Sequence, residues 1–130
     1  PEMAARLKAR GLRPQLIVAS GARRAHATAK LMAEVFGYAK ADIGIVDELY
    51  EASPRVWLAQ IRALPVGVDT VMMVGHNPEI TALVAELCPE ARIDNVPTCG
   101  VLCLDYEVRD WAGIATAQPR SWDFDYPKNG

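Results

Sequence analysis

The stretch that decides the fold is DTVMMVGHNPEITALVAEL, residues 69–87. An apolar run over 71–74 ends at Gly75 and His76, and apolar residues then recur at every third or fourth position after Pro78. A short apolar run bounded by glycine predicts a buried strand, and the later spacing predicts a helix. The stretch therefore predicts a strand that passes directly into a helix, with a histidine at the junction.

The same patterns recur along the rest of the chain. Apolar runs predict a strand over 15–20 and a shorter one within 43–50. Helices are predicted over 1–11, 21–37 and 53–64 and from residue 78, with Ser20, Ser53 and Asn77 as the N-caps of the last three. Two further strands are predicted within 98–108 and 113–119, and we expect them to pair antiparallel. A surface loop is predicted over 120–130.

Strands that alternate with amphipathic helices are typical of an α/β domain with a mainly parallel sheet. We therefore predict a three-layer α/β/α sandwich, with one domain over residues 1–130 as the default at this length. In such sheets ligands bind at the carboxyl ends of the strands. The junctions VASGARRAHATA (18–29) and MVGHNPEIT (73–81) should then open on the same edge.

Composition narrows the class of protein and of partner. The chain is 51% hydrophobic with a formal charge of -2, so a globular fold is expected and nucleic-acid binding has no general support. Its cysteines, Cys88, Cys99 and Cys103, have neither zinc nor redox spacing, and we expect reduced, mostly buried thiols in the cytoplasm. No apolar run approaches the roughly 20 residues that cross a bilayer, so no membrane partner is expected.

Two arginines fall in the first turn of the helix predicted after the first junction. Cations there oppose the helix dipole, which favours negative charge at an N-terminus, and a bound anion would remove this conflict. Arg23 and Arg24, together with the free backbone N–H groups of a helix start, would suit a phosphate group. The alternative is that both arginines are solvated surface residues.

The chain has two histidines, which have different surroundings. His76, at the second junction, could donate to a phosphate oxygen or take part in proton transfer, or it could cap a backbone carbonyl. His26 lies two residues beyond Arg24 on the same predicted helix and so points away from it, and we expect it to have a surface or packing role.

Acid candidates gather in one irregular segment, where Asp47, Glu48 and Glu51 could protonate a leaving group or could simply be solvated carboxylates. The chain contains no GxxxxGK[ST], no GxGxxG after a strand, no HExxH and no GxSxG. Anion chemistry would therefore rest on arginine and histidine, and no metal or other cofactor is expected.

Four segments also match a known pattern. LIVASGARRAHATAKLMAE (16–34) resembles the Ser-Pro-x-x-Arg-Ala-x-x-Thr-Ala segment of the histidine phosphatase superfamily, which has the phosphoglycerate-mutase-like fold. VMMVGHNPEITALVAEL (71–87) resembles its Val-Gly-His-Asn-Pro segment. DELYEAS (47–53) and VPTCGVLCLDY (96–106) look most like its short branch, the SixA-type phosphohistidine phosphatases.

The resemblance implies covalent phosphoryl transfer without a metal, in which a histidine attacks phosphorus and water then hydrolyses the phosphohistidine. His76 would be the second histidine of that site, and Arg24 would bind the phosphate, a role not carried over to Arg23. Ser20 and Asn77 complete the expected phosphate ligands, and Glu48 is the expected acid.

The chain departs from the family in two places. Gly21 stands where the family usually has proline, which changes the stiffness of the loop. The family's nucleophile lies in an Arg-His-Gly or Arg-His-Ala motif at the end of the first strand, and nothing in the 130 residues matches it. PEMAARLKARGL (1–12) resembles the helix downstream of that motif, so we expect an upstream segment with the nucleophile and a core strand. The domain would then be an N-terminally truncated histidine phosphatase fold.

The expected function is a phosphatase that acts on phosphohistidine or on another phosphorylated small molecule or phosphoprotein, with the 130 residues alone inactive. The alternative is a non-catalytic phosphate-binding module, or an inactive relic of the family. A mutase is a third reading, for which the chain looks too short. An unpaired sheet edge would favour dimers.

Overall fold

The computed structural model describes residues 2–97, 101–115 and 117–127, and the chain divides into two compact units. Unit 1 comprises Pro1–Tyr50 and Val68–His76, and unit 2 comprises Glu51–Gly67 and Asn77–Gly130. The single domain expected from the length stays a prediction. Cys99 and the start of the strand predicted within 98–108 lie outside the described residues.

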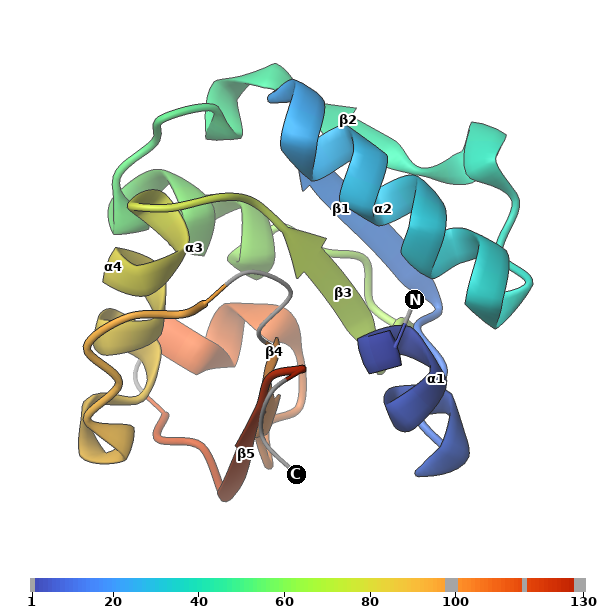
Figure 1. Cartoon of the computed structure of the whole chain (residues 1–130). Helices are drawn as coiled ribbons and strands as arrows, with labels where there is room; N and C mark the ends of the chain where they lie inside the picture. The colour runs from blue at the N-terminus through green and yellow to red at the C-terminus, as the bar shows by residue number, and fades with distance from the viewer. Residues whose placement is uncertain (1, 98–100, 116, 128–130) are drawn as a thin grey trace. The chain divides into compact units, whose positions relative to one another are not determined.

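Unit 1 is built on a parallel three-stranded sheet with the order β2-β1-β3 (Figure 1). β1 (Leu16–Ser20) lies in the centre and pairs with β2 (Gly44–Val46) on one side and with β3 (Val71–Val74) on the other. Ile17 of β1 is fully buried in the apolar core of the unit, as expected for a strand covered by helix. The α/β class with a parallel sheet is confirmed.

Two helices complete most of unit 1. α1 spans Glu2–Ala9, and α2 spans Arg23–Phe36 and lies along the sheet (Figure 1). The buried stripe of α2 contains Ala25 and Ala29, whose small side chains let the helix approach β1 closely. α2 ends at Gly37, which has a left-handed φ of 70° as the predicted glycine stop requires.

The predicted N-cap of α2 is wrong. Ser20 is still part of β1, and the cap position is taken by Ala22, which makes no side-chain cap hydrogen bond. The hydroxyl of Ser20 instead accepts a hydrogen bond from the backbone N–H of Ala22 at 3.4 Å. The serine therefore shapes the turn between strand and helix rather than capping the helix itself.

The described residues of unit 2 include two α-helices and an antiparallel pair of strands. α3 (Pro54–Arg62) follows Ser53 at the cap position, as predicted, and buries Trp57 fully. α4 (Glu79–Leu87) begins one residue after the predicted start, so Pro78 takes the cap position and the prediction of Asn77 as the N-cap is wrong. β4 (Val101–Asp105) pairs with β5 (Ser121–Asp125). None of the described helices is both long and apolar enough to span a membrane.

The strand predicted within 113–119 is wrong, because its first part forms a 3-10 helix, η4 (Trp111–Ala115). Gly113 donates its N–H to the backbone carbonyl of Asp110, which closes a turn there. The partner of β4 is β5, in the segment predicted as a loop. Its aromatic side chains alternate, which suits a pleated strand, and Arg120 forms an ion pair with Asp105 at the end of the hairpin.

Candidate functional site

Parallel pairing brings the ends of all three strands of unit 1 to one edge of the sheet. Ser20, the last residue of β1, lies opposite Val46 of β2, and Ala19 lies opposite Val74 of β3. The segments that follow the strands therefore leave from the same edge, where α/β sheets bind ligands. The register confirms that the two junctions singled out from the sequence share this edge.

The turn after β1 is crowded by a carboxylate from the segment after β2. Side-chain atoms of Asp47 occupy the space that a Cβ atom on Gly21 would need, and the Cα atom of Asp47 lies 3.3 Å from that position. Only glycine fits this close approach without a shift of the neighbour. Asp47 therefore lies at the entrance to α2, where a negative charge interacts favourably with the helix dipole.

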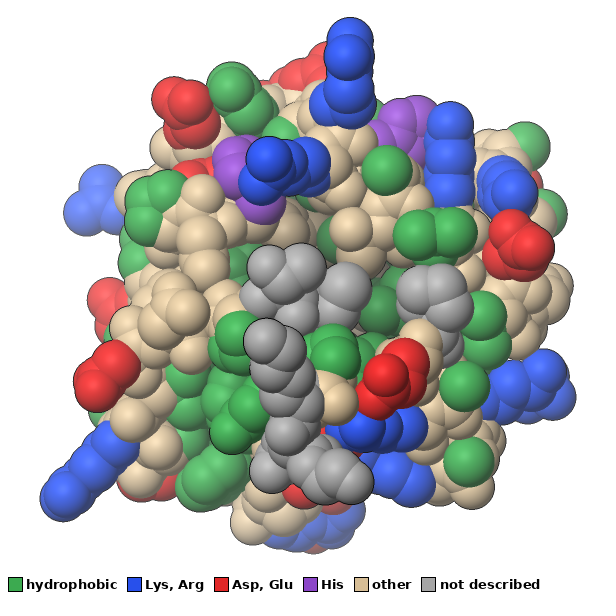
Figure 2. Space-filling model, in the orientation of Figure 1, with side chains coloured by type: hydrophobic (Ala, Val, Ile, Leu, Met, Phe, Trp, Pro, Cys, Tyr) green, Lys and Arg blue, Asp and Glu red, His purple; other side chains and the backbone are tan. Residues whose placement is uncertain are grey.

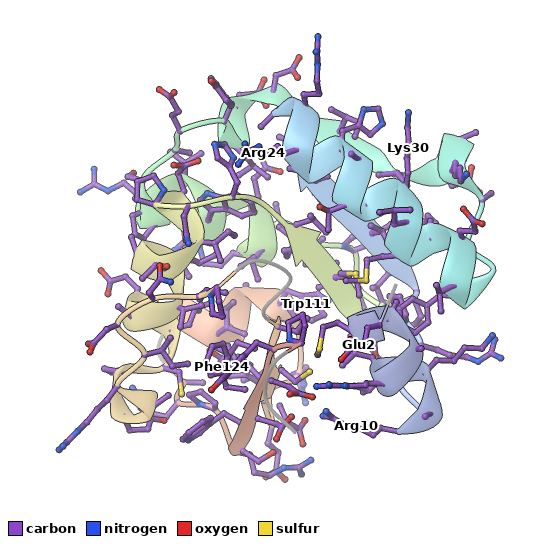
Figure 3. The ribbon with its side chains drawn as sticks, viewed as in Figure 1. Glu2, Arg10, Arg24, Lys30, Trp111 and Phe124 are labelled. Carbon is purple, nitrogen blue, oxygen red and sulfur yellow. The ribbon has the colours of Figure 1, made fainter. Side chains whose placement is uncertain are left out.

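Two exposed arginines, Arg23 and Arg24, begin α2, and its first turn contains no acidic side chain. Figure 3 shows Arg24 projecting from this end of the helix, and Figure 2 shows basic and histidine side chains gathered over it. An open pocket of about 390 Å³ lies beside the helix start and is lined by Gly21, Ala22, Arg23, Asp47 and Tyr50. Arg23, to which the resemblance gives no role, thus lines the pocket, whereas Arg24 and His76 are not among its lining residues.

His76 follows β3 and is half-buried, with its Nδ1 atom inaccessible to solvent. Its ring stacks on that of Tyr50, with 5.8 Å between the ring centroids and 29° between the ring planes. Tyr50 therefore both contacts His76 and lines the pocket. This tyrosine was not predicted as a site residue, because its only signal in the sequence is its place in DELYEAS, one residue after the apolar Leu49.

The carboxylates of the irregular segment take different positions. Asp47 and Glu48 lie in the 3-10 helix η2 (Asp47–Leu49), and both are exposed. Asp47 is among the residues that line the pocket, and Glu48 is not. Glu51 belongs to unit 2 and adopts a left-handed φ of 53°, which is unfavourable for a residue other than glycine or asparagine.

Asn77 begins the second segment of unit 2, one peptide bond after His76. Its amide donates to Asn95 Oδ1 at 3.2 Å and to the carbonyl of Val96 at 2.7 Å. Its oxygen accepts from the backbone N–H of Thr81 at 3.2 Å and from the Thr81 hydroxyl at 2.7 Å. Both amide hydrogens and the oxygen of Asn77 are thus engaged within unit 2.

Metal ligands do not cluster in the part of the chain that the structure describes: no group of three or more His, Cys, Asp or Glu side chains there could hold an ion. His26, the other histidine, lies within α2 and is partly buried.

The solved structures that are similar to the chain include two SixA proteins. The SixA protein of Agrobacterium tumefaciens, assigned as a phosphohistidine phosphatase, is 30% identical with a TM-score of 0.74, over 97% of this chain and 76% of that one. A protein of Nakamurella multipartitia with the same assignment is 23% identical with a TM-score of 0.66, over 98% of this chain and 78% of that one, and shows the fold alone. No curated protein matches the sequence.

Residues 1–86 match the sequence model of the haloacid dehalogenase-like hydrolases, which places this part of the chain in that family of hydrolases. The two assignments share the hydrolase class and name different families. The SixA relationship is the more extensive, because it reaches β4 and β5, which the family match does not. It also confirms the predicted phosphoglycerate-mutase-like fold. In fold, and in sequence along nearly its whole length, the chain belongs to the SixA-like histidine phosphatases.

Proposed function

We propose that the protein is a phosphatase that hydrolyses phosphohistidine, or another phosphorylated small molecule or protein, through a covalent phosphohistidine intermediate. One observation carries the proposal: the sheet edge of unit 1 joins the arginine-bearing start of α2, a pocket and the stacked His76. The SixA protein of Agrobacterium tumefaciens, which is assigned as a phosphohistidine phosphatase, supports it. Phosphoryl transfer needs positioning and positive charge around the phosphoryl oxygens, and such an edge can supply both.

Arg24 and His76 are the proposed contacts to the phosphoryl oxygens, together with backbone N–H groups at the start of α2. Ser20 is fully buried, and its hydroxyl accepts the N–H of Ala22, so its proposed role is to shape the phosphate-binding turn. Asn77 has its amide hydrogens on Asn95 and Val96, which supports a role in holding the turn after His76 rather than in binding phosphate directly.

The proposed proton donor belongs to η2. Glu48 was the acid expected from the sequence, but its side chain does not line the pocket. Asp47 does line it, and we propose that Asp47 protonates the leaving group.

The proposed nucleophile lies outside the 130 residues, on a strand that ends in an Arg-His motif. Neither His26 nor His76 follows an arginine in the sequence. Among the described residues, β3 pairs with β1 on one side only, so its second edge could accept another strand. A parallel strand added there would bring its carboxyl end, and thus the histidine, to the edge that carries His76.

The proposed reaction has two steps. The neutral imidazole of the nucleophile attacks phosphorus, and the bond from phosphorus to the leaving group breaks as Asp47 gives its proton to that group. Water then attacks the phosphorus of the phosphohistidine and gives a proton to the Asp47 carboxylate. The bond from phosphorus to the imidazole nitrogen breaks, so that inorganic phosphate leaves and the neutral histidine is regenerated. No cofactor is proposed. The free thiols of Cys88 and Cys103 agree with the cytoplasm as the proposed compartment.

Steady-state kinetics of the protein with its Arg-His segment test the proposal. It should hydrolyse an aryl phosphate, and His76→Ala or Arg24→Ala should each lower kcat/KM by about a hundredfold or more. Lys30→Ala, an exposed cation farther along α2, is the matched control and should have nearly the wild-type rate. Near-normal rates for both His76→Ala and Arg24→Ala would contradict the proposed site.

A non-catalytic phosphate-binding module is the second candidate, favoured by the observation that neither histidine of the 130 residues lies in an Arg-His motif. It predicts that phosphate or vanadate binds to the 130 residues and that added salt weakens this binding. It also predicts no catalysis when the Arg-His segment is present, so turnover by that protein would eliminate it.

A further inference from the structure

We propose that Tyr50 is a positioning residue for His76: its ring holds the imidazole in the orientation that phosphoryl transfer uses. This inference rests on the proposed function, because it gives Tyr50 a role in the same site. The stack itself is a feature of the structure, with 5.8 Å between the ring centroids and 29° between the planes. The centroid distance lies within the range usual for aromatic pairs.

Tyr50 is fixed from the backbone side. It follows Leu49, which is fully buried, and its N–H donates to the carbonyl of Asp47 at 3.0 Å. The apolar side chain anchors η2 to unit 1, and the backbone hydrogen bond sets where the next residue points. The backbone that carries the tyrosine ring is thus tied to unit 1 by the buried Leu49 and by this hydrogen bond.

Tyr50 is 52% exposed, so burial of apolar area is a weak reason for the position of its ring. It lines the pocket with Arg23 and Asp47 and presents one part of its surface to His76. An imidazole without such a neighbour can rotate about its terminal torsion, which is broad for histidine. Stacking removes that freedom before the substrate binds.

The orientation matters because the two ring nitrogens of His76 are not equivalent. Its Nδ1 atom is inaccessible to solvent, so only Nε2 could face a phosphoryl oxygen. A rotation of the ring would move Nε2 out of line with that oxygen. Loss of the Tyr50 ring should therefore lower kcat and change KM little, since Arg24, the proposed phosphate-binding arginine, remains.

The first test is spectroscopic and does not need activity. The ring protons of His76, assigned with a His76→Gln variant, should lie upfield of their usual position because of the ring current of Tyr50. Tyr50→Phe should keep this shift, and Tyr50→Ala should abolish it. Tyr38→Ala, which removes a tyrosine of unit 1 that bonds Asp42 instead, is the control and should leave the shift unchanged. An unchanged His76 spectrum in Tyr50→Ala would overturn the inference.

The second test is a kinetic double-mutant cycle on the protein with its Arg-His segment. Tyr50→Ala should lower kcat by about tenfold, Tyr50→Phe should restore most of it, and Tyr50→Ala should cost nothing further in a His76→Ala background. Additive losses would overturn the inference, because Tyr50 would then act independently of His76. If the wild-type protein shows no turnover, the proposed function is overturned. This result differs from additive losses, which would overturn only the role of Tyr50.

Discussion

The Cγ atom of Asp47 lies 3.2 Å from the position that a Cβ atom on Gly21 would occupy, and its Oδ1 atom lies closer still. The residues that follow β1 and β2 are thus in close contact. Because Gly21 has no side chain, the Asp47 carboxylate fits beside it. The resemblance to the histidine phosphatases places proline at this position. In this chain, glycine instead lets an acidic group enter the turn that begins α2.

Gly21→Ala should lower the free energy of unfolding by about 1–2 kcal/mol, because the new methyl group displaces the Asp47 side chain and crowds its backbone. Gly44→Ala in β2 is the matched control, since its Cβ atom would meet nothing nearer than 3.8 Å. Urea denaturation measures both. The cost of Gly21→Ala should shrink in an Asp47→Ala background, and an equal cost in both backgrounds would exclude the clash as its cause.

Asp47→Asn should slow the hydrolysis of alkyl phosphates by about a hundredfold or more and that of nitrophenyl phosphate much less, because a good leaving group needs no proton. Glu48→Gln is the control, since Glu48 does not line the pocket. The measurement is the dependence of kcat/KM on the pKa of the leaving group in the protein with its Arg-His segment. A steeper dependence in Glu48→Gln than in Asp47→Asn would transfer the acid role to Glu48.

Asn77→Ala should lower the free energy of unfolding by about 1–3 kcal/mol, because it removes hydrogen bonds to Thr81, Asn95 and Val96 together. Asn95→Ala, which loses a single exposed bond of 3.2 Å to Asn77, should cost clearly less. Urea denaturation of both variants gives the comparison. Equal losses would show that the Asn77 network does not stabilise unit 2.

Alkaline pH should destabilise unit 2 through Tyr106. Burial raises the pKa of its hydroxyl, with smaller effects from Cys88 and Glu90. The neutral form is favoured in the folded state, so this contribution to stability is complete below the unfolded-state pKa of about 10. It is lost as the pH rises from there through the higher folded-state pKa.

Tyr106→Phe should therefore reduce the fall in unfolding free energy above about pH 10. At neutral pH the same variant should be neutral or more stable by about 1 kcal/mol, because the buried hydroxyl has no hydrogen-bond partner among the described residues. Tyr38→Phe, which removes a hydroxyl that donates to Asp42 at 3.0 Å, should lose stability instead. Denaturant titrations from pH 7 to pH 11 measure the free energy of unfolding of each variant. If it falls as much above pH 10 in Tyr106→Phe as in the wild type, Tyr106 is not the cause of the alkaline destabilisation.

Local patterns in the sequence predicted the parallel sheet and the helices because each strand of unit 1 is a short apolar run next to an amphipathic segment. The strand β5 was not predicted, because the polar and charged residues of SWDFD (121–125) are typical of a loop, although Trp122 and Phe124 alternate. Ser20 was misread as a cap because the sequence does not show that β1 continues through it.

The candidate site was predicted in part, for a physical reason. Helix starts and strand ends follow from local spacing, so the positions of Arg24 and His76 at the sheet edge could be inferred. The approach of Asp47 to Gly21 and the stack of Tyr50 on His76 join segments far apart in the sequence. Only the pairing register of the three strands brings these groups together, and no local pattern encodes it.

Transfer of phosphate to a histidine is tested most directly by trapping the phosphoenzyme. The protein with its Arg-His segment is mixed with a radiolabelled phosphorylated substrate, denatured within a turnover and tested for the stability of the bound label. A phosphohistidine intermediate predicts bound label that survives alkali and is lost in acid. No label should be bound when the histidine of the Arg-His motif is replaced. Label released by alkali and by hydroxylamine would mean that a carboxylate is phosphorylated, in line with the haloacid dehalogenase-like match. That result would contradict phosphate transfer to a histidine.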